Sequence, residues 1–108
     1  MSINIFLAED HRLVRDGFRV LLETQPDLKV IGEAGDGRET VKQVLKLNPD
    51  IVLMDIGMPE LNGIEATRQI CEACPPTKVI ILSMYSTSEH IARAFKAGAR
   101  GYILKESA

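Results

Sequence analysis

The sequence predicts an α/β domain built on a doubly wound parallel sheet. Five short apolar segments alternate with four segments whose apolar residues recur at the spacing of one helical face. Aromatic residues are few, with three Phe, two Tyr and no Trp, so the core is mainly aliphatic. Strict alternation of strands and helices with right-handed crossovers produces a parallel sheet covered by helices. We expect one domain over residues 1–108, because this length suits a single core.

Each predicted strand is a short apolar run bounded by polar or turn-forming residues. The runs at 51–54 and 79–82 are apolar throughout, which is typical of central strands buried on both faces. The other runs contain more polar residues. In chain order, the predicted strands are 3–8, 28–33, 51–54, 79–82 and 101–104.

Capping and breaking residues delimit the four predicted helices. Asp36, with Glu39 three residues later, forms a capping box at the start of the second helix. Proline cannot continue a helix, and glycine readily adopts the left-handed conformation that ends one. By these signals the four helices end in turn near Pro26, Pro49, Pro75 and Gly98.

Composition and charge exclude several classes of protein. Thirteen Lys and Arg residues against 15 Asp and Glu residues give a net charge of −2, and the basic residues are scattered. Direct nucleic-acid binding by this domain is therefore disfavoured. The aliphatic runs are too short to span a bilayer, and no export signal is visible, so we expect a cytoplasmic protein without membrane contact.

Three carboxylates, a hydroxyl and an ammonium group follow four of the predicted strands. Glu9 and Asp10 follow the first strand and Asp55 the third, while Ser83 and Lys105 follow the fourth and fifth. The carboxyl ends of parallel strands meet at one edge, where such sheets bind ligands. Each residue alone has an ordinary explanation as a helix cap, turn residue or surface charge. Their occurrence together at one edge favours a shared site.

The residue types in this cluster suit a divalent cation and a phosphoryl group. Crowded carboxylates are costly to keep ionised unless a cation lies among them. Hard oxygen ligands without His or Cys are typical of Mg²⁺, which also recruits phosphate oxygens. Phosphoryl transfer requires mainly positioning and charge neutralisation, which Lys105 and Ser83 would help to supply. A carboxylate can itself accept the phosphoryl group as an aspartyl phosphate.

With these features the sequence resembles the receiver domain of two-component response regulators. The resemblance covers the whole chain and includes Glu9-Asp10, the segment 55–63, Ser83, Tyr102 and Lys105. It implies a flavodoxin-like, five-stranded sheet with strand order 2-1-3-4-5. Two further segments, 9–17 and 97–105, are most similar to the NarL/LuxR-type branch. That narrower resemblance implies a helix-turn-helix DNA-binding output domain, which this chain does not contain.

The resemblance implies that Asp55 accepts a phosphoryl group from a sensor histidine kinase in a Mg²⁺-dependent phosphorelay. Asp10 would bind the ion directly and Glu9 would bind it through water. Asp55 and the backbone carbonyl of Gly57 would complete the protein ligands. The protein would then be a signalling switch, with no catalysis beyond its own phosphorylation and dephosphorylation.

The remaining three residues would respond to the phosphoryl group. Lys105 would pair with its oxygens, and Ser83 would turn its hydroxyl toward it and pull on the loop before the fourth helix. Tyr102 would change rotamer as that loop moves; the alternative is an ordinary half-buried strand tyrosine. The switch would control the missing output domain, and through it DNA and transcription. The resemblance leaves a homodimer open.

Two features depart from the usual receiver pattern. Lys105 is followed by Glu106, where many receivers have a proline after a cis peptide. A cis bond without proline costs about 2.5–4 kcal/mol, so the direction of the Lys105 amine is open. Receivers also continue into a fifth helix, whereas this sequence ends three residues after Lys105. We therefore expect a C-terminally truncated receiver that lacks the fifth helix.

Two sets of residues outside the cluster have ordinary interpretations. Cys71 and Cys74 have the C-x-x-C spacing of redox pairs. They lie at the end of a predicted helix, however, where the helix dipole opposes a thiolate. A redox or zinc site is therefore disfavoured. We interpret His11 and His90 as surface histidines, since neither has a metal or nucleophile partner in its motif.

Three other functions are weighed against the signalling switch. A Mg²⁺-dependent phosphohydrolase often has a second Asp two residues after its nucleophile, but this position is Gly57, and the short connections leave no cap over a substrate. A flavodoxin-like flavin site needs a Ser/Thr/Gly-rich phosphate loop after the first strand, where Glu9-Asp10 would repel phosphate. A phosphorylation-independent interaction domain would not need the complete acidic site.

Overall fold

The computed structural model describes residues 2–105, which contain five parallel strands and four helices. The strand order is 2-1-3-4-5, and each neighbouring pair is parallel. The predicted flavodoxin-like, doubly wound fold is confirmed, and the described residues contain no fifth helix. The elements are β1 (Ile3–Ala8), α1 (Arg12–Glu23), β2 (Leu28–Ala34), α2 (Gly37–Leu47), β3 (Ile51–Asp55), α3 (Gly63–Ala73), β4 (Lys78–Ser83), α4 (Ser88–Ala97) and β5 (Gly101–Leu104).

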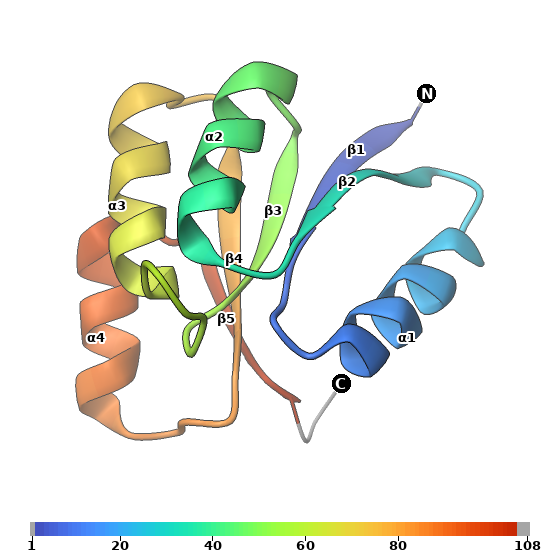
Figure 1. Ribbon diagram of the computed structural model, residues 1–108. Helices are drawn as coiled ribbons and strands as arrows, with labels where there is room; N and C mark the ends of the chain where they lie inside the picture. Colours follow the sequence, from blue (N-terminus) through green and yellow to red (C-terminus); the bar gives the residue numbers. More distant parts are fainter. Residues whose placement is uncertain (1, 106–108) are drawn as a thin grey trace.

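The sheet separates two hydrophobic cores. Helix α1 lies on one face, and α2, α3 and α4 lie on the other (Figure 1). Successive strand residues point to opposite faces. Ile5 and Leu7 of β1 therefore pack on the α1 side, whereas Phe6 and Ala8 join the larger core against the other three helices. All four side chains are buried, and this fixes the end of β1 at the carboxyl edge of the sheet.

The ends of the helices agree with the predicted caps. Asp36 accepts a hydrogen bond from the Glu39 amide at 2.8 Å, and Thr87 caps α4 through the His90 amide. Gly98 ends α4 with a φ of 116°, a conformation that favours glycine. Among the helices between residues 2 and 105, none has the length and apolar character needed to cross a membrane.

The apolar stripe of α1 is narrower than its sequence suggests. Val14, Phe18, Leu21 and Leu22 recur at helical spacing, which predicts that all four face the core. Phe18 and Leu22 pack against the sheet, but Val14 and Leu21 are 38% and 59% exposed. Each residue turns a helix by about 100°, so a helix that centres Phe18 and Leu22 on the sheet leaves Leu21 at the side.

Candidate functional site

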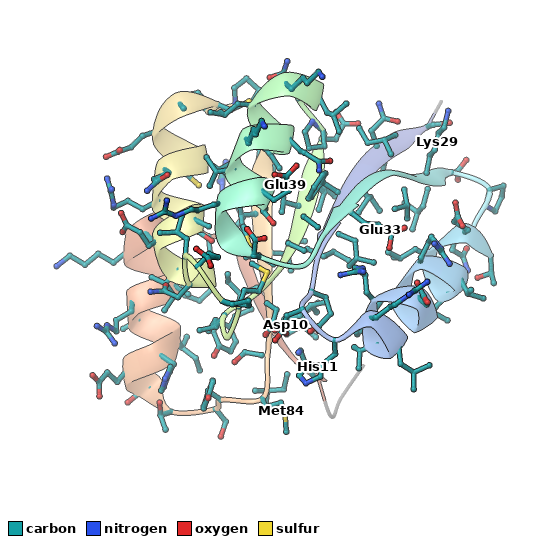
Figure 2. All side chains as sticks on the ribbon, in the orientation of Figure 1. Asp10, His11, Lys29, Glu33, Glu39 and Met84 are labelled. Atoms are coloured by element: carbon teal, nitrogen blue, oxygen red, sulfur yellow. The ribbon has the colours of Figure 1, made fainter. Side chains whose placement is uncertain are left out.

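The carboxyl edge of the sheet brings the predicted charged residues together. Glu9 and Asp10 directly follow β1, Asp55 is the last residue of β3, and Lys105 follows β5. The Lys105 Nζ lies 2.7 Å from Glu9 Oε1 and 3.2 Å from Asp55 Oδ1. In Figure 2, Asp10 and His11 lie at this edge, with Met84 on the neighbouring β4–α4 loop. The strands of the parallel sheet therefore assemble one site from residues far apart in the sequence.

Glu9 is the most deeply buried charged residue of this site. Its side chain is fully buried, and a buried carboxylate is stable only when it is paired. Lys105 supplies the opposite charge to Oε1, and the His11 amide donates to Oε2 at 3.2 Å. The Lys105 side chain is itself only 16% exposed. The two charges thus hold each other at the sheet edge.

The carboxyl group of Asp55 has an unusual affinity for protons. Burial raises its pKa to about 6, and the neighbouring carboxyl groups of Glu9 and Asp10 contribute in the same direction against the opposing effect of Lys105. Burial would also raise the pKa of Asp10, but its interactions with Asp55, Glu9 and His11 outweigh burial and lower that pKa. One ammonium group therefore neutralises three crowded carboxyl groups only in part.

A divalent cation would fit this excess of negative charge. Asp10 Oδ1 is buried and accepts no hydrogen bond within the described residues. The donor set of Asp10, Asp55 and Glu9 consists of carboxylate oxygens, which Mg²⁺ prefers. The side chains at this edge thus have both the charge and the donor chemistry for the predicted ion.

Gly57 takes part through its backbone only. Its amide donates to Asp55 Oδ1 at 3.4 Å, and a Cβ built at this position would meet no atom within 4 Å. Space therefore does not require glycine here. The predicted role of its carbonyl as a metal ligand stays a prediction, one that a side chain at this position would not obstruct.

Ser83 and Tyr102, the two predicted switch residues, both contact Tyr85. The buried Ser83 Oγ accepts a hydrogen bond from the Tyr85 amide at 2.9 Å. The Tyr102 hydroxyl donates to the Tyr85 carbonyl at 2.7 Å. The Tyr85 ring also stacks on His90, with ring centroids 4.5 Å apart. The β4–α4 loop is thus tied to β4, β5 and α4 at one residue, which sequence reasoning did not single out.

Two glycines, Gly37 and Gly63, shape the loop that follows Asp55. The Gly63 amide donates to the Ile56 carbonyl at 2.8 Å, and a Cβ at Gly63 would overlap the backbone oxygen of Asp55. A Cβ at Gly37 would likewise overlap the backbone oxygen of Leu61. Close backbone contact on both sides therefore requires glycine at these positions, and it fixes the path of the chain away from the site.

Arg15 supports the acidic pair from α1 and was also missed in the sequence. Its Nη1 donates to the backbone carbonyl of Glu9 at 2.8 Å, and its Nε lies 3.4 Å from Glu33 Oε1. This contact joins the end of β1 to α1 and β2. Its sequence signal is weak, because an arginine early in an amphipathic helix is usually an ordinary surface residue.

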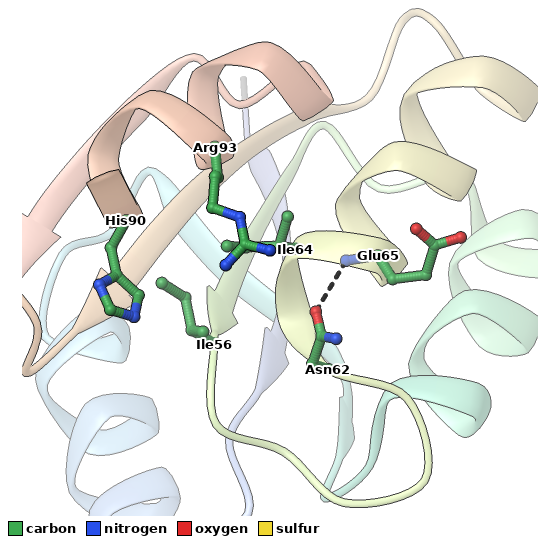
Figure 3. Close-up of a pocket in the computed structure, with 6 residues that line it drawn as sticks. All are labelled: Ile56, Asn62, Ile64, Glu65, His90 and Arg93. Carbon is green, nitrogen blue, oxygen red and sulfur yellow. Dashed lines mark hydrogen bonds between the residues drawn. The ribbon is translucent and has the colours of Figure 1, made fainter. Parts of the chain in front are cut away.

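Two cavities lie near this edge. A cavity of about 240 Å³ opens over Asp55 and is lined by His11, Asp55, Gly57, Met84, Tyr85 and Lys105. A second cavity, of about 340 Å³, lies between α3 and α4 (Figure 3). There the Asn62 side chain is the N-cap of α3 and accepts a hydrogen bond from the Glu65 amide at 2.9 Å. None of the predicted site residues lines the second cavity, so a ligand of Asp55 belongs in the first.

The two cysteines contact different neighbours. Cys71 Sγ lies 3.5 Å from the Gly98 carbonyl, whereas Cys74 Sγ lies 3.2 Å from both Asn48 Oδ1 and Thr77 Oγ1. Burial raises the pKa of the Cys71 thiol, which is the opposite of what a reactive thiolate requires. Both residues are therefore accounted for by packing at the end of α3.

A 2-1-3-4-5 parallel sheet with acidic residues and a lysine at its carboxyl edge has the architecture of a receiver domain. The family comparison agrees with this class: the chain belongs to the response regulator receiver domain family, whose model matches residues 5–108. Its relatives are LuxR/NarL-family response regulators, which confirms the narrower resemblance.

The chain is similar to the transcriptional regulatory protein LiaR from Bacillus subtilis (strain 168), with 44% identity over 105 residues. That match covers 97% of this chain and 50% of LiaR. The chain spans about half the length of the curated relatives it matches. These relatives include proteins described as transcriptional regulatory proteins.

Solved structures give the same assignment. A LuxR-family two-component response regulator from Aurantimonas sp. SI85-9A1 matches with a TM-score of 0.93 and 39% identity, over 97% of this chain and 75% of that one. The CheX–CheY–BeF₃–Mg²⁺ complex from Borrelia burgdorferi matches with a TM-score of 0.86 and 27% identity, over 95% and 78% of the two chains.

Proposed function

We propose that Asp55 accepts a phosphoryl group from a phosphohistidine of a sensor kinase in a Mg²⁺-dependent reaction. The observation that carries this proposal is the position of the Lys105 ammonium, 3.2 Å from Asp55 Oδ1 below a cavity that opens over both residues. In the proposed function, the phosphorylated receiver domain controls a helix-turn-helix output domain that regulates transcription. The relatives described above are bacterial transcriptional regulators, and bacterial DNA lies in the cytoplasm. We therefore propose a cytoplasmic location for this protein.

The chemistry assigned to Asp55 is a nucleophilic displacement at phosphorus. A carboxylate oxygen forms the new P–O bond while the P–N bond of the phosphohistidine breaks, and the electron pair remains on the imidazole nitrogen. Asp55 must be ionised to attack, and a pKa of about 6 leaves it largely ionised at neutral pH. Lys105 is close enough to Asp55 to form an ion pair with the phosphoryl oxygens as negative charge develops on them.

Four groups would hold the ion: the carboxylates of Asp10 and Asp55, the carbonyl of Gly57 and, through water, Glu9. When bound, Mg²⁺ would neutralise charge on the phosphoryl oxygens. Two observations support this set of ligands. Asp10 Oδ1 is buried without a hydrogen bond from the described residues, and Lys105 neutralises only part of the charge of the three carboxyl groups. The CheX–CheY complex from Borrelia burgdorferi, which contains both Mg²⁺ and BeF₃, supports the same assignment.

The response assigned to the modified domain centres on Tyr85. A phosphoryl group adds about −1.5 to −2 charges at the sheet edge. The Ser83 hydroxyl oxygen accepts a hydrogen bond from the Tyr85 amide, so the hydroxyl proton of Ser83 can be donated to a phosphoryl oxygen. Turning Ser83 toward Asp55 would pull the Tyr85 backbone, and Tyr102 would follow through its bond to the Tyr85 carbonyl. The switch would therefore act on the β4–α4 loop and β5 together.

Incubation with acetyl phosphate and Mg²⁺, followed by intact-mass measurement, tests the proposed phosphoacceptor. We expect one phosphoryl adduct on the parent protein, none on Asp55→Asn and none when EDTA replaces Mg²⁺. Equal adducts on the parent and the variant, or no adduct on the parent, would contradict the proposal. Repeated turnover of a small phosphate ester would instead favour a phosphohydrolase.

A further inference from the structure

His11 lies against both carboxylates of the acidic pair. Its Nδ1 is 3.3 Å from Asp10 Oδ1 and 3.4 Å from Glu9 Oε2. One potential ligand atom from each of the three residues lies within 4.8 Å of the other two. The His11 side chain is 73% exposed, as expected of a surface histidine, and its Nδ1 faces the carboxylate oxygens of Glu9 and Asp10.

The distance from His11 Nδ1 to Asp10 Oδ1 is close to that between neighbouring ligands of one octahedral ion. With bonds of about 2.1 Å, two ligand atoms at a right angle are about 3.0 Å apart. The observed separation of 3.3 Å from Asp10, the carboxylate proposed to bind the ion directly, requires only a small closure. Asp10 Oδ1, the buried oxygen without a hydrogen bond, is the atom that faces the imidazole. His11 also lines the cavity that contains Asp55 and Lys105.

We propose that His11 becomes a ligand when the cation at this site is a late first-row transition metal such as Ni²⁺, and that it increases the preference of the site for these metals over Mg²⁺. This inference rests on the proposed function for the identity of the cation site. Imidazole nitrogen suits Ni²⁺, Co²⁺ and Zn²⁺, whereas Mg²⁺ prefers oxygen. An exposed imidazole beside carboxylates can therefore coordinate a transition metal, whereas Mg²⁺ is coordinated by the oxygens alone.

A purely ionic role for His11 predicts a different outcome. If the ring only paired with the carboxylates as a cation, it would compete with every divalent ion to a similar extent. Its removal would then strengthen the binding of Mg²⁺ and Ni²⁺ together. A ligand role predicts that Ni²⁺ binding alone weakens, so the ratio of the two affinities separates the explanations.

Titration calorimetry with Mg²⁺ and with Ni²⁺ measures this ratio on the parent protein, His11→Ala and His90→Ala. His90 is the matched control, because it is the other histidine of the chain and hydrogen-bonds to Thr87 in the β4–α4 loop. We expect the ratio of Ni²⁺ to Mg²⁺ affinity to fall at least about tenfold in His11→Ala and to stay unchanged in His90→Ala. An equal change for both metals in His11→Ala, or no change, would overturn the inference.

Pulsed electron paramagnetic resonance of bound Cu²⁺ gives a second readout. Imidazole suits Cu²⁺, a late first-row ion, whereas Mn²⁺ prefers oxygen ligands as Mg²⁺ does. We expect coupling to an imidazole nitrogen in the parent protein and its loss in His11→Ala; the absence of such coupling in the parent would count against ligation. The acetyl phosphate experiment keeps the two proposals separable. A protein that binds Ni²⁺ through His11 but takes up no phosphoryl group would contradict the proposed function alone. A phosphorylated protein with an unchanged metal ratio in His11→Ala would contradict this inference alone.

Discussion

Asp55 lies at the end of β3, where it is buried beside two other carboxyl groups and receives only part of the charge of Lys105. Its pKa of about 6 means that the folded protein holds a proton more tightly than the unfolded chain, in which the ordinary value is 3.8. Above about pH 6 Asp55 is ionised in the folded protein, and its buried charge lowers the free energy of unfolding. The proposed phosphoacceptor is therefore a residue that we expect to destabilise the unmodified domain.

The free energy of unfolding should reveal this cost through its dependence on pH. Between about pH 4 and 6 the folded state binds more protons than the unfolded state, so we expect Asp55 to lower stability as pH rises. Replacement by Asn removes the charge and should stabilise the metal-free protein at pH 7 by about 1–3 kcal/mol. Urea unfolding of the parent and Asp55→Asn at pH 4 and pH 7 measures both effects. An equal stability difference at the two pH values would refute the explanation.

At the scale of secondary-structure elements, the path of the β3–α3 loop depends on the close contact between Gly63 and the backbone of Asp55. Gly63→Ala should destabilise the protein by about 2 kcal/mol or more, because the added methyl group meets backbone that cannot move aside. Gly57→Ala is the matched control in the same loop, with open space around the added Cβ. Thermal unfolding of both variants tests the contrast. A Gly63→Ala protein as stable as Gly57→Ala would show that the loop adjusts freely.

The β4–α4 loop is held by the bond between the Tyr102 hydroxyl and the Tyr85 carbonyl. Tyr102→Phe removes this bond and keeps the ring, so we expect faster amide hydrogen exchange in residues 84–88. Phosphorylation from acetyl phosphate should remain, because Tyr102 is absent from the set of groups around Asp55. Exchange rates measured by mass spectrometry decide the first expectation and intact mass decides the second. Unchanged exchange would indicate that the stack of Tyr85 on His90 holds the loop alone.

The elements were predictable because their signals are local. Two fully apolar runs mark the central strands, and Asp36 with Glu39 marks the start of α2. The convergence of Glu9, Asp10, Asp55 and Lys105 follows from the rule that the carboxyl ends of parallel strands share an edge. The contacts of Tyr85 and Arg15 were missed because they depend on the path of a loop and on the angle between α1 and β2. Asn62, which is followed three residues later by Glu65, carries a capping pattern that could have been found.

At the scale of the whole molecule, the solvent-exposed surface of α1 contains large apolar residues. Leu13, Val20 and Leu21 are 85%, 61% and 59% exposed, and their spacing places them along one side of the helix. We expect association of this 108-residue chain that rises with concentration, because exposed apolar surface favours contact with another molecule. Sedimentation velocity should show a smaller average mass for Leu13→Lys/Leu21→Lys than for the parent. A parent that stays monomeric at high concentration would contradict this expectation.

The link from Glu9 to Lys105 joins residues near opposite ends of the described chain. The proposed cation site would therefore form only after β1, β3 and β5 have taken their places in the sheet, and no local fragment would form it. Contacts between such distant residues form late, since closing a long stretch of chain is entropically costly. A bound cation would consequently slow the unfolding rate and leave the folding rate almost unchanged. Occupancy of the site would then lengthen the lifetime of the folded receiver.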